Sequence, residues 1–152
     1  SVRSGAYQRI LQELDPDVAV TARACPLFVP LVENGRFRRG DVVIETVARE
    51  YLEPLRREGL DTLILGCTHY PLLTDIIGDI MGPGVTLINT GEEAAWELKR
   101  TLRAMDLLAP EGPAGRAILC ASDQPEHFGS LAAYFLGESL TRPVQPVDID
   151  RY

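Results

Sequence analysis

The sequence predicts an α/β fold: a mainly parallel sheet with helices on both faces. Short apolar runs typical of buried strands alternate along the chain with longer segments of helical periodicity. The clearest run, TLIL at 62–65, is followed by Gly66 and then by polar residues, as expected where a strand of an open sheet ends at a ligand crevice. With 152 residues, 45% of them hydrophobic, the chain can form a core of its own.

The first third of the chain predicts a helix, a strand and a second helix. Residues 4–14 have helical spacing of apolar side chains. Residues 18–25 alternate and are rich in β-branched side chains, which favours a strand ending at Cys25. The stretch PLFVPLVEN, residues 26–34, then predicts a short helix that Gly35 closes.

A long helix is expected over 41–58. Asp41 is a suitable N-cap, because its carboxylate can accept from a free backbone N–H of the first turn. Pro54 should kink or shorten this helix, since proline has no N–H to donate. The expected apolar stripe consists of Val43, Val47, Tyr51 and Leu55.

The rest of the chain repeats strand and helix, an order that implies parallel pairing through crossover helices. A linker is expected over 109–115, where APEGPAG is rich in glycine and proline. The predicted elements are strand 62–66, helix 71–81, strand 85–89, helix 91–108, strand 116–121, helix 125–136 and an extended segment over 144–150.

Composition excludes several classes of function. No apolar run approaches the roughly 20 residues of a membrane span, and the N-terminal stretch lacks the apolar region of a signal peptide, so we expect a cytoplasmic protein without a membrane partner. A net charge of −7 argues against nucleic acid as a partner. Three widely spaced cysteines indicate reduced thiols. No glycine-rich phosphate loop or metal-binding motif is present, so no nucleotide or metal cofactor is expected.

The stretch GCTHYP at 66–71 combines a thiol with polar neighbours at the predicted end of a strand. Helix N-termini favour thiolates, and Cys67 precedes a predicted helix and lies two residues from His69. The alternative is that Cys67 is a small buried apolar residue. Cys25 has apolar residues after it and is a weaker candidate for a reactive thiol. Cys120 is expected in the middle of a strand, as a core residue.

Glu33 is the one carboxylate in the apolar helix at 26–34. It could be an acid–base partner, an orienting group for His69, or a solvent-facing charge near a helix end. His127, at the start of the predicted helix 125–136, is expected to be solvated or to cap that helix.

Three segments together resemble the glutamate racemases of the aspartate/glutamate racemase superfamily. They are SGAYQRIL, ACPLFVPLVENG and GCTHYPLL, and their order and spacing also fit. The later stretches LINTGEEAA and CASDQPEHFGSLAAYFLG are similar to the same family, so the resemblance covers the whole chain.

The resemblance implies a cofactor-independent isomerase with two pseudo-symmetric α/β domains and glutamate between them, supplying D-glutamate for peptidoglycan. One cysteine thiolate removes the α-proton while a second cysteine, as a thiol, reprotonates the opposite face. Cys67 matches the second catalytic cysteine, Thr68 a residue that binds the substrate carboxylate, and His69 one that lines the site and assists the thiol. Glu33 matches an assisting acid, and Ser1 stands where the family has a threonine lining the cleft.

The chain departs from the family in one respect. The first catalytic cysteine and the substrate-binding D-S-G segment, which the family carries ahead of SGAY, are not in this sequence. We therefore expect one catalytic half: most of the second domain over 1–88, and a segment completing the first domain over 89–152. By itself it is expected to be inactive, and to associate with itself or with the missing N-terminal half. The alternatives are a single-cysteine, decarboxylase-like relative and an inactive truncated product.

Overall fold

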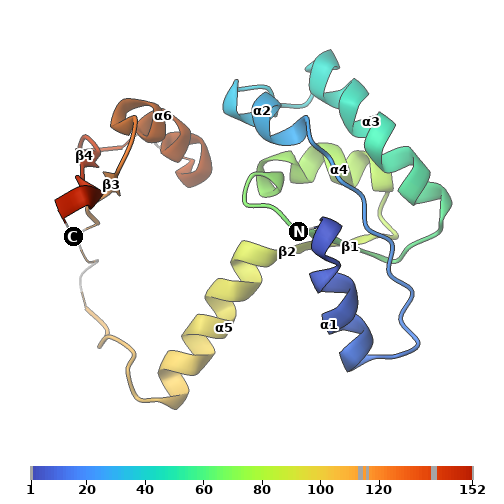
Figure 1. Ribbon diagram of the computed structural model, residues 1–152, viewed down its shortest axis with the longest axis horizontal. Helices are drawn as coiled ribbons and strands as arrows, with labels where there is room; N and C mark the ends of the chain where they lie inside the picture. Colours follow the sequence, from blue (N-terminus) through green and yellow to red (C-terminus); the bar gives the residue numbers. More distant parts are fainter. Residues whose placement is uncertain (1, 113–114, 116, 138–139, 152) are drawn as a thin grey trace. The chain divides into compact units, whose positions relative to one another are not determined.

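The computed structural model describes residues 2–112, 115, 117–137 and 140–151 (Figure 1). The chain forms two compact units, one up to Trp96 and one from Glu97 onwards. The predicted division into functional domains after residue 88 concerns the complete racemase fold and stays a prediction.

The first unit contains a parallel two-stranded sheet. β1 (Thr62–Leu65) and β2 (Thr86–Asn89) are joined by the short 3-10 helix η2 (Tyr70–Leu73) and by α4 (Thr74–Met81). The paired residues are Thr62 with Thr86, Leu63 with Leu87, Ile64 with Ile88 and Leu65 with Asn89. This crossover confirms the predicted parallel βαβ order. The helix predicted over 71–81 begins instead with a 3-10 turn.

Three further helices belong to the first unit: α1 (Ala6–Leu14), α2 (Phe28–Glu33) and α3 (Val42–Arg57). In Figure 1, α2, α3 and α4 gather on one side of the two strands and α1 lies on the other. The Asp41 carboxylate accepts from the Val43 backbone N–H at 3.0 Å, which confirms the predicted N-cap of α3.

The buried face of α3 differs from the predicted stripe. Val43 is exposed and Val47 half-buried, because positions spaced strictly by four drift around a helix of 3.6 residues per turn. Pro54 does not shorten α3, which continues to Arg57; the carbonyl left without its N–H partner belongs to the exposed residue Glu50. The buried residues of α3 are Ile44, Ala48, Tyr51, Leu52 and Leu55.

The core lies between α2, α3, α4 and β1. Each large apolar side chain buried there contributes about 1.5–3 kcal/mol relative to exposure. Its members besides those of α3 are Cys25, Phe28, Val32, Leu65, Leu73, Ile76, Ile77, Ile80 and Met81. α1 has no fully buried residue.

The strand predicted over 18–25 is wrong. This segment has no regular secondary structure and connects α1 to α2. Val18 and Val20 are half-buried between exposed neighbours, so the alternation reflects one-sided burial without a neighbouring strand to pair with. Cys25, at the end of the segment, is buried in the turn before α2.

The second unit combines helices with two very short strands. α5 (Thr90–Ala104) crosses into it from the first unit and ends four residues earlier than the predicted helix over 91–108. α6 (Pro125–Leu136) matches the prediction and joins β3 (Cys120–Ala121) to β4 (Gln145–Pro146), which pair in parallel. A 3-10 turn, η3 (Ile149–Arg151), follows.

Two predictions for the second unit are wrong or incomplete. Only two residues of the strand predicted over 116–121 pair with β4, and residue 116 lies outside the described part of the chain. Cys120 is exposed, contrary to the expected core position, because a two-residue strand in a two-stranded sheet gives its side chain little cover. Within the described residues, no helix combines the length and the apolar character that crossing a membrane requires.

Candidate active site

The site lies where β1 ends. Leu65 is buried, and the Gly66 N–H donates to the Ile64 carbonyl at 3.0 Å, so the chain turns out of the sheet before Cys67. The Thr90 hydroxyl, at the start of α5, donates to the Leu65 carbonyl at 3.1 Å. This bond ties the carboxyl ends of the two strands together and fixes the base from which Cys67 projects.

His69 is the centre of a group of four side chains. Its Nε2 lies 3.1 Å from Glu33 Oε1. Its Nδ1 lies 3.3 Å from Thr68 Oγ1 and 4.0 Å from Cys67 Sγ. The structure therefore brings together the four described side chains that the sequence analysis selected, although Glu33 is 36 positions away in sequence.

These contacts assign the tautomer of a neutral His69. A carboxylate can only accept, so the Nε2 atom facing Glu33 carries the hydrogen and donates it. The lone pair of Nδ1 then faces Cys67 and Thr68, which both have a hydrogen to donate. The ring is thus placed to accept a hydrogen bond from the Cys67 thiol, and its contact with Glu33 holds it in that orientation.

Burial differs within the group. The side chain of His69 is 19% exposed, that of Glu33 39%, while Cys67 is half-buried and Thr68 exposed. Solvent therefore reaches the group at Thr68 and Glu33, while Cys67 and His69 are partly covered. Cys67 is not at an α-helix N-terminus as expected, because α4 begins only at Thr74; its polar neighbour is His69.

The second thiol of the first unit is in a different state. Burial raises the pKa of Cys25 to about 11, with a smaller opposing effect from the positive charge of Arg23. Its carbonyl accepts from the Tyr70 hydroxyl at 3.4 Å. Burial, and next the nearby thiols of Cys25 and Cys67, raise the pKa of Tyr70 to about 12. Cys25 and Tyr70 therefore stay neutral near pH 7.

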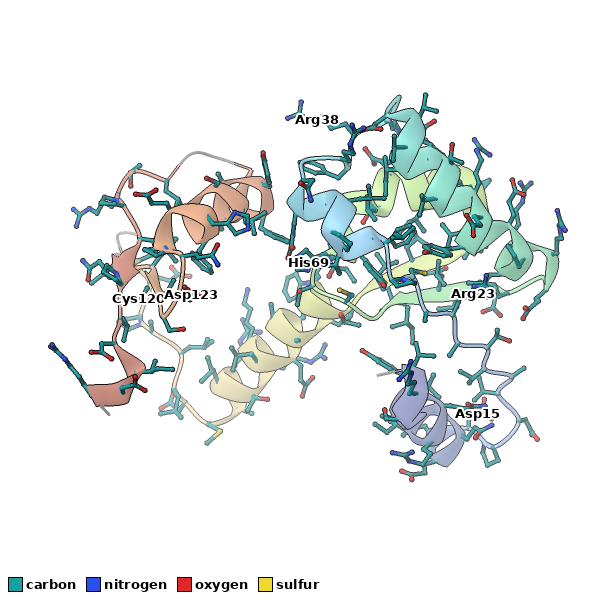
Figure 2. All side chains as sticks on the ribbon, turned by 45° about the horizontal axis from the view of Figure 1, so that its top comes forward. Asp15, Arg23, Arg38, His69, Cys120 and Asp123 are labelled. Carbon is teal, nitrogen blue, oxygen red and sulfur yellow. The ribbon has the colours of Figure 1, made fainter. Side chains whose placement is uncertain are left out.

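The remaining sequence candidates lie outside the described residues or belong to the second unit. Ser1 lies outside the residues that the structure describes. His127 is an exposed residue of α6, and Cys120 belongs to the second unit, where Figure 2 labels it with Asp123. Among the described residues, no cluster of three or more His, Cys, Asp or Glu side chains is placed to hold a metal ion.

Sequence reasoning missed the connections that support the site. The Asn89 side chain accepts from the backbone N–H groups of Gly91 and Glu92, at 3.1 and 3.3 Å, and so caps the start of α5. The pattern N-T-G-E-E is a recognisable helix-start signal that could have revealed this cap. The bond from Thr90 to Leu65 had no such signal, because it joins positions 25 apart.

Curated relatives match this chain along nearly all of its length. The glutamate racemase of Mycobacterium ulcerans is 45% identical over 149 residues, which are 96% of this chain and 54% of the relative. That of Geobacter metallireducens is 43% identical over 140 residues, 92% of this chain and 51% of the relative. This chain is homologous to glutamate racemases. It spans about half the length of the curated racemases it matches.

Solved glutamate racemase structures share the fold. The Francisella tularensis enzyme in complex with D-glutamate matches with a TM-score of 0.85 at 30% identity, covering 99% of this chain and 55% of the enzyme. The Thermus thermophilus enzyme in complex with β-chloro-D-alanine matches with a TM-score of 0.81 at 43% identity, covering 99% and 54%. No protein-family model matches the chain. The α/β fold class is thereby confirmed.

Proposed function

We propose that this chain carries one of the two proton-transferring faces of a cofactor-independent glutamate racemase, which supplies D-glutamate for peptidoglycan. The observation that carries the proposal is the contact series Cys67–His69–Glu33 at the end of β1, in a chain whose relatives are glutamate racemases. This arrangement suits a thiol that must exchange a proton repeatedly.

In the proposed reaction, the Cys67 thiolate takes the α-hydrogen of glutamate as a proton. The Cα–H bond breaks, its electron pair stays on Cα and spreads into the carboxylate, and an S–H bond forms. A second thiol then gives a proton to the opposite face. In the reverse direction Cys67 is the proton donor. Because the α-hydrogen is a very weak acid, the carbanion needs hydrogen-bond donors in a site shielded from water.

His69 and Glu33 would prepare the thiol. Nδ1 of His69 accepts the Cys67 proton, and Glu33 holds the ring through Nε2, so that the lone pair stays directed at the thiol. The exposed Thr68 hydroxyl, next to the same ring, is proposed to bind the substrate carboxylate. Ser1 is proposed to contribute to the same cleft.

The second thiol is proposed to come from outside these 152 residues. Cys25 is buried and its pKa is raised to about 11, so it cannot serve as a base near neutral pH. We propose that residues 1–88 supply the Cys67 face and residues 89–152 complete the partner domain. Incubated with L-glutamate, the chain alone should then be slower than a complete racemase by about 10²–10⁴-fold, the typical cost of one missing acid or base.

A chimera tests this function. The chain is fused behind the first half of the Thermus thermophilus racemase, and loss of optical activity from L-glutamate is followed by circular dichroism. The chimera should racemise glutamate, its Cys67→Ala variant should lose roughly 10²–10⁴-fold, and Cys120→Ala should keep the parent rate. Equal rates for the parent and Cys67→Ala would show that Cys67 is not the base.

A further inference from the structure

An aromatic contact lies close in sequence to both members of the His69–Glu33 pair. Tyr70 follows His69 directly and begins η2, while Phe28 begins α2, whose last residue is Glu33. The rings of Phe28 and Tyr70 meet edge to face, with centroids 5.3 Å apart and an interplanar angle of 89°. The contact thus joins the segment that carries His69 to the helix that carries Glu33.

The ion pair by itself is a weak connection. Its side chains are 19% and 39% exposed, and partly exposed pairs are screened by solvent and lose side-chain entropy when they form. Phe28 is only 1% exposed and so cannot shift without disturbing the core. Packing between the two segments that carry these side chains can therefore contribute to the spacing between Nε2 and Oε1.

We propose that Tyr70 is the positioning residue of the site: its ring, seated on Phe28, holds the His69 segment at the distance from α2 at which His69 meets Glu33. The inference rests on the proposed function for the roles of His69 and Glu33. Tyr70 contacts neither substrate nor the reacting atoms in this account. It acts through the placement of its neighbour His69.

The hydroxyl of Tyr70 adds a second anchor. It donates to the Cys25 carbonyl, in the turn that leads into α2, at 3.4 Å. With a pKa raised to about 12 by burial, the phenol keeps this hydrogen over the whole working range of pH. Because the bond is long, the ring should contribute more to the positioning than the hydroxyl does.

Tyr51 provides a matched control. It packs on the same Phe28 ring from α3, with centroids 5.4 Å apart and an angle of 74°, and it is buried. α3 carries none of the four site residues. Tyr51→Leu and Tyr70→Leu therefore each remove one aromatic contact from Phe28. Only Tyr70→Leu should loosen the segment that carries His69.

The test is a double-mutant cycle on the 152-residue chain, read out as the rate at which iodoacetamide alkylates Cys67. Peptide mapping by mass spectrometry gives the rates of the three thiols separately. Exposed Cys120 is the internal reference, and absence of label on buried Cys25 shows that a variant is folded. Glu33→Gln should slow Cys67 by roughly 3- to 10-fold, as expected for loss of one partly exposed charge-assisted hydrogen bond.

The effect of Glu33→Gln on the alkylation rate of Cys67 should depend on Tyr70 and not on Tyr51. In a Tyr70→Leu background, Glu33→Gln should change the rate by less than about twofold, because the pair is already separated. In the Tyr51→Leu and Tyr70→Phe backgrounds the full effect should remain. The NMR signal of the His69 Nε2–H, slowed in exchange by its bond to Glu33, should disappear in Tyr70→Leu and persist in Tyr51→Leu.

An undiminished effect of Glu33→Gln in the Tyr70→Leu background, with the His69 signal retained, would overturn the inference. So would the absence of any effect of Glu33→Gln in the parent. If the chimera is inactive but Tyr70→Leu still removes the effect of Glu33→Gln on Cys67, the racemase function is rejected and the positioning role of Tyr70 is supported.

Discussion

The two units of the chain differ in how they are held together. Every fully buried apolar side chain among the described residues lies between Cys25 and Met81, in the first unit. α5 and α6 contain no fully buried residue. The exposed apolar side chains of the second unit include Leu98, Met105, Phe128, Tyr134 and Phe135. The first unit thus has a core of its own that supports the site, while the second presents apolar surface suited to packing against another surface.

A matched pair of substitutions should show this difference as a large effect on stability. Leu73→Ala removes a side chain with 0% exposure and should lower the free energy of unfolding by about 2–5 kcal/mol. Leu98→Ala, at a position 58% exposed, should change it by less than about 0.5 kcal/mol. Urea unfolding at low protein concentration measures both. Equal losses would mean that the two units share one core.

The pH dependence of stability should report the buried thiol of the first unit. Burial raises the pKa of Cys25 from its ordinary value of 9.0 to about 11. Below pH 9 both states keep the proton; between about pH 9 and 11 the unfolded state loses it first, so folding becomes less favourable as pH rises. Two pKa units correspond to about 2–3 kcal/mol.

Urea unfolding between pH 8 and pH 11.5 measures that loss, and Cys25→Ala is the comparison. The variant should lose less stability over this range, although Tyr70, whose pKa is also raised, still contributes at the alkaline end. A parent and variant with the same pH dependence would show that Cys25 ionises as freely in the folded chain as in the unfolded one.

We expect the exposed apolar side chains of α5, Leu98 among them, to mediate association of the chain with itself or with the N-terminal half of a racemase. Leu98→Gln should weaken self-association by roughly 3- to 10-fold in dissociation constant, because it removes apolar area from the contact. Arg103→Gln, five positions after Leu98 on the same helix and therefore on a different face, is the control. Light scattering coupled to size-exclusion chromatography over a range of concentrations measures the effect, and a monomer at every concentration would contradict it.

Sequence patterns predicted the elements whose signals are local. The N-cap at Asp41, the apolar run at 62–65 and the helix over 125–136 each depend on neighbouring residues, and each is confirmed. The strand over 18–25 and the core position of Cys120 failed. Both depend on which distant segments lie alongside, and alternation within one segment does not carry that information.

The site was predictable to a similar extent. Cys67, Thr68 and His69 are adjacent in sequence, so their proximity followed from the motif. The approach of Glu33 to His69 spans 36 positions and was open between three interpretations from the residues alone. The Tyr70–Phe28 contact that brings these segments together depends on ring packing in three dimensions and had no counterpart in the pattern.

The most direct test of the account is the effect of His69→Ala on the reactivity of Cys67 in the chain itself. In the parent, brief iodoacetamide treatment at neutral pH should label Cys67 first, because His69 Nδ1, the proposed acceptor of its proton, lies 4.0 Å from its sulfur. His69→Ala should slow Cys67 by roughly tenfold and leave Cys120 unchanged. Labelling of Cys67 at the same rate with and without His69, or faster labelling of Cys120 in the parent, would contradict the claim that these residues form a proton-transferring site.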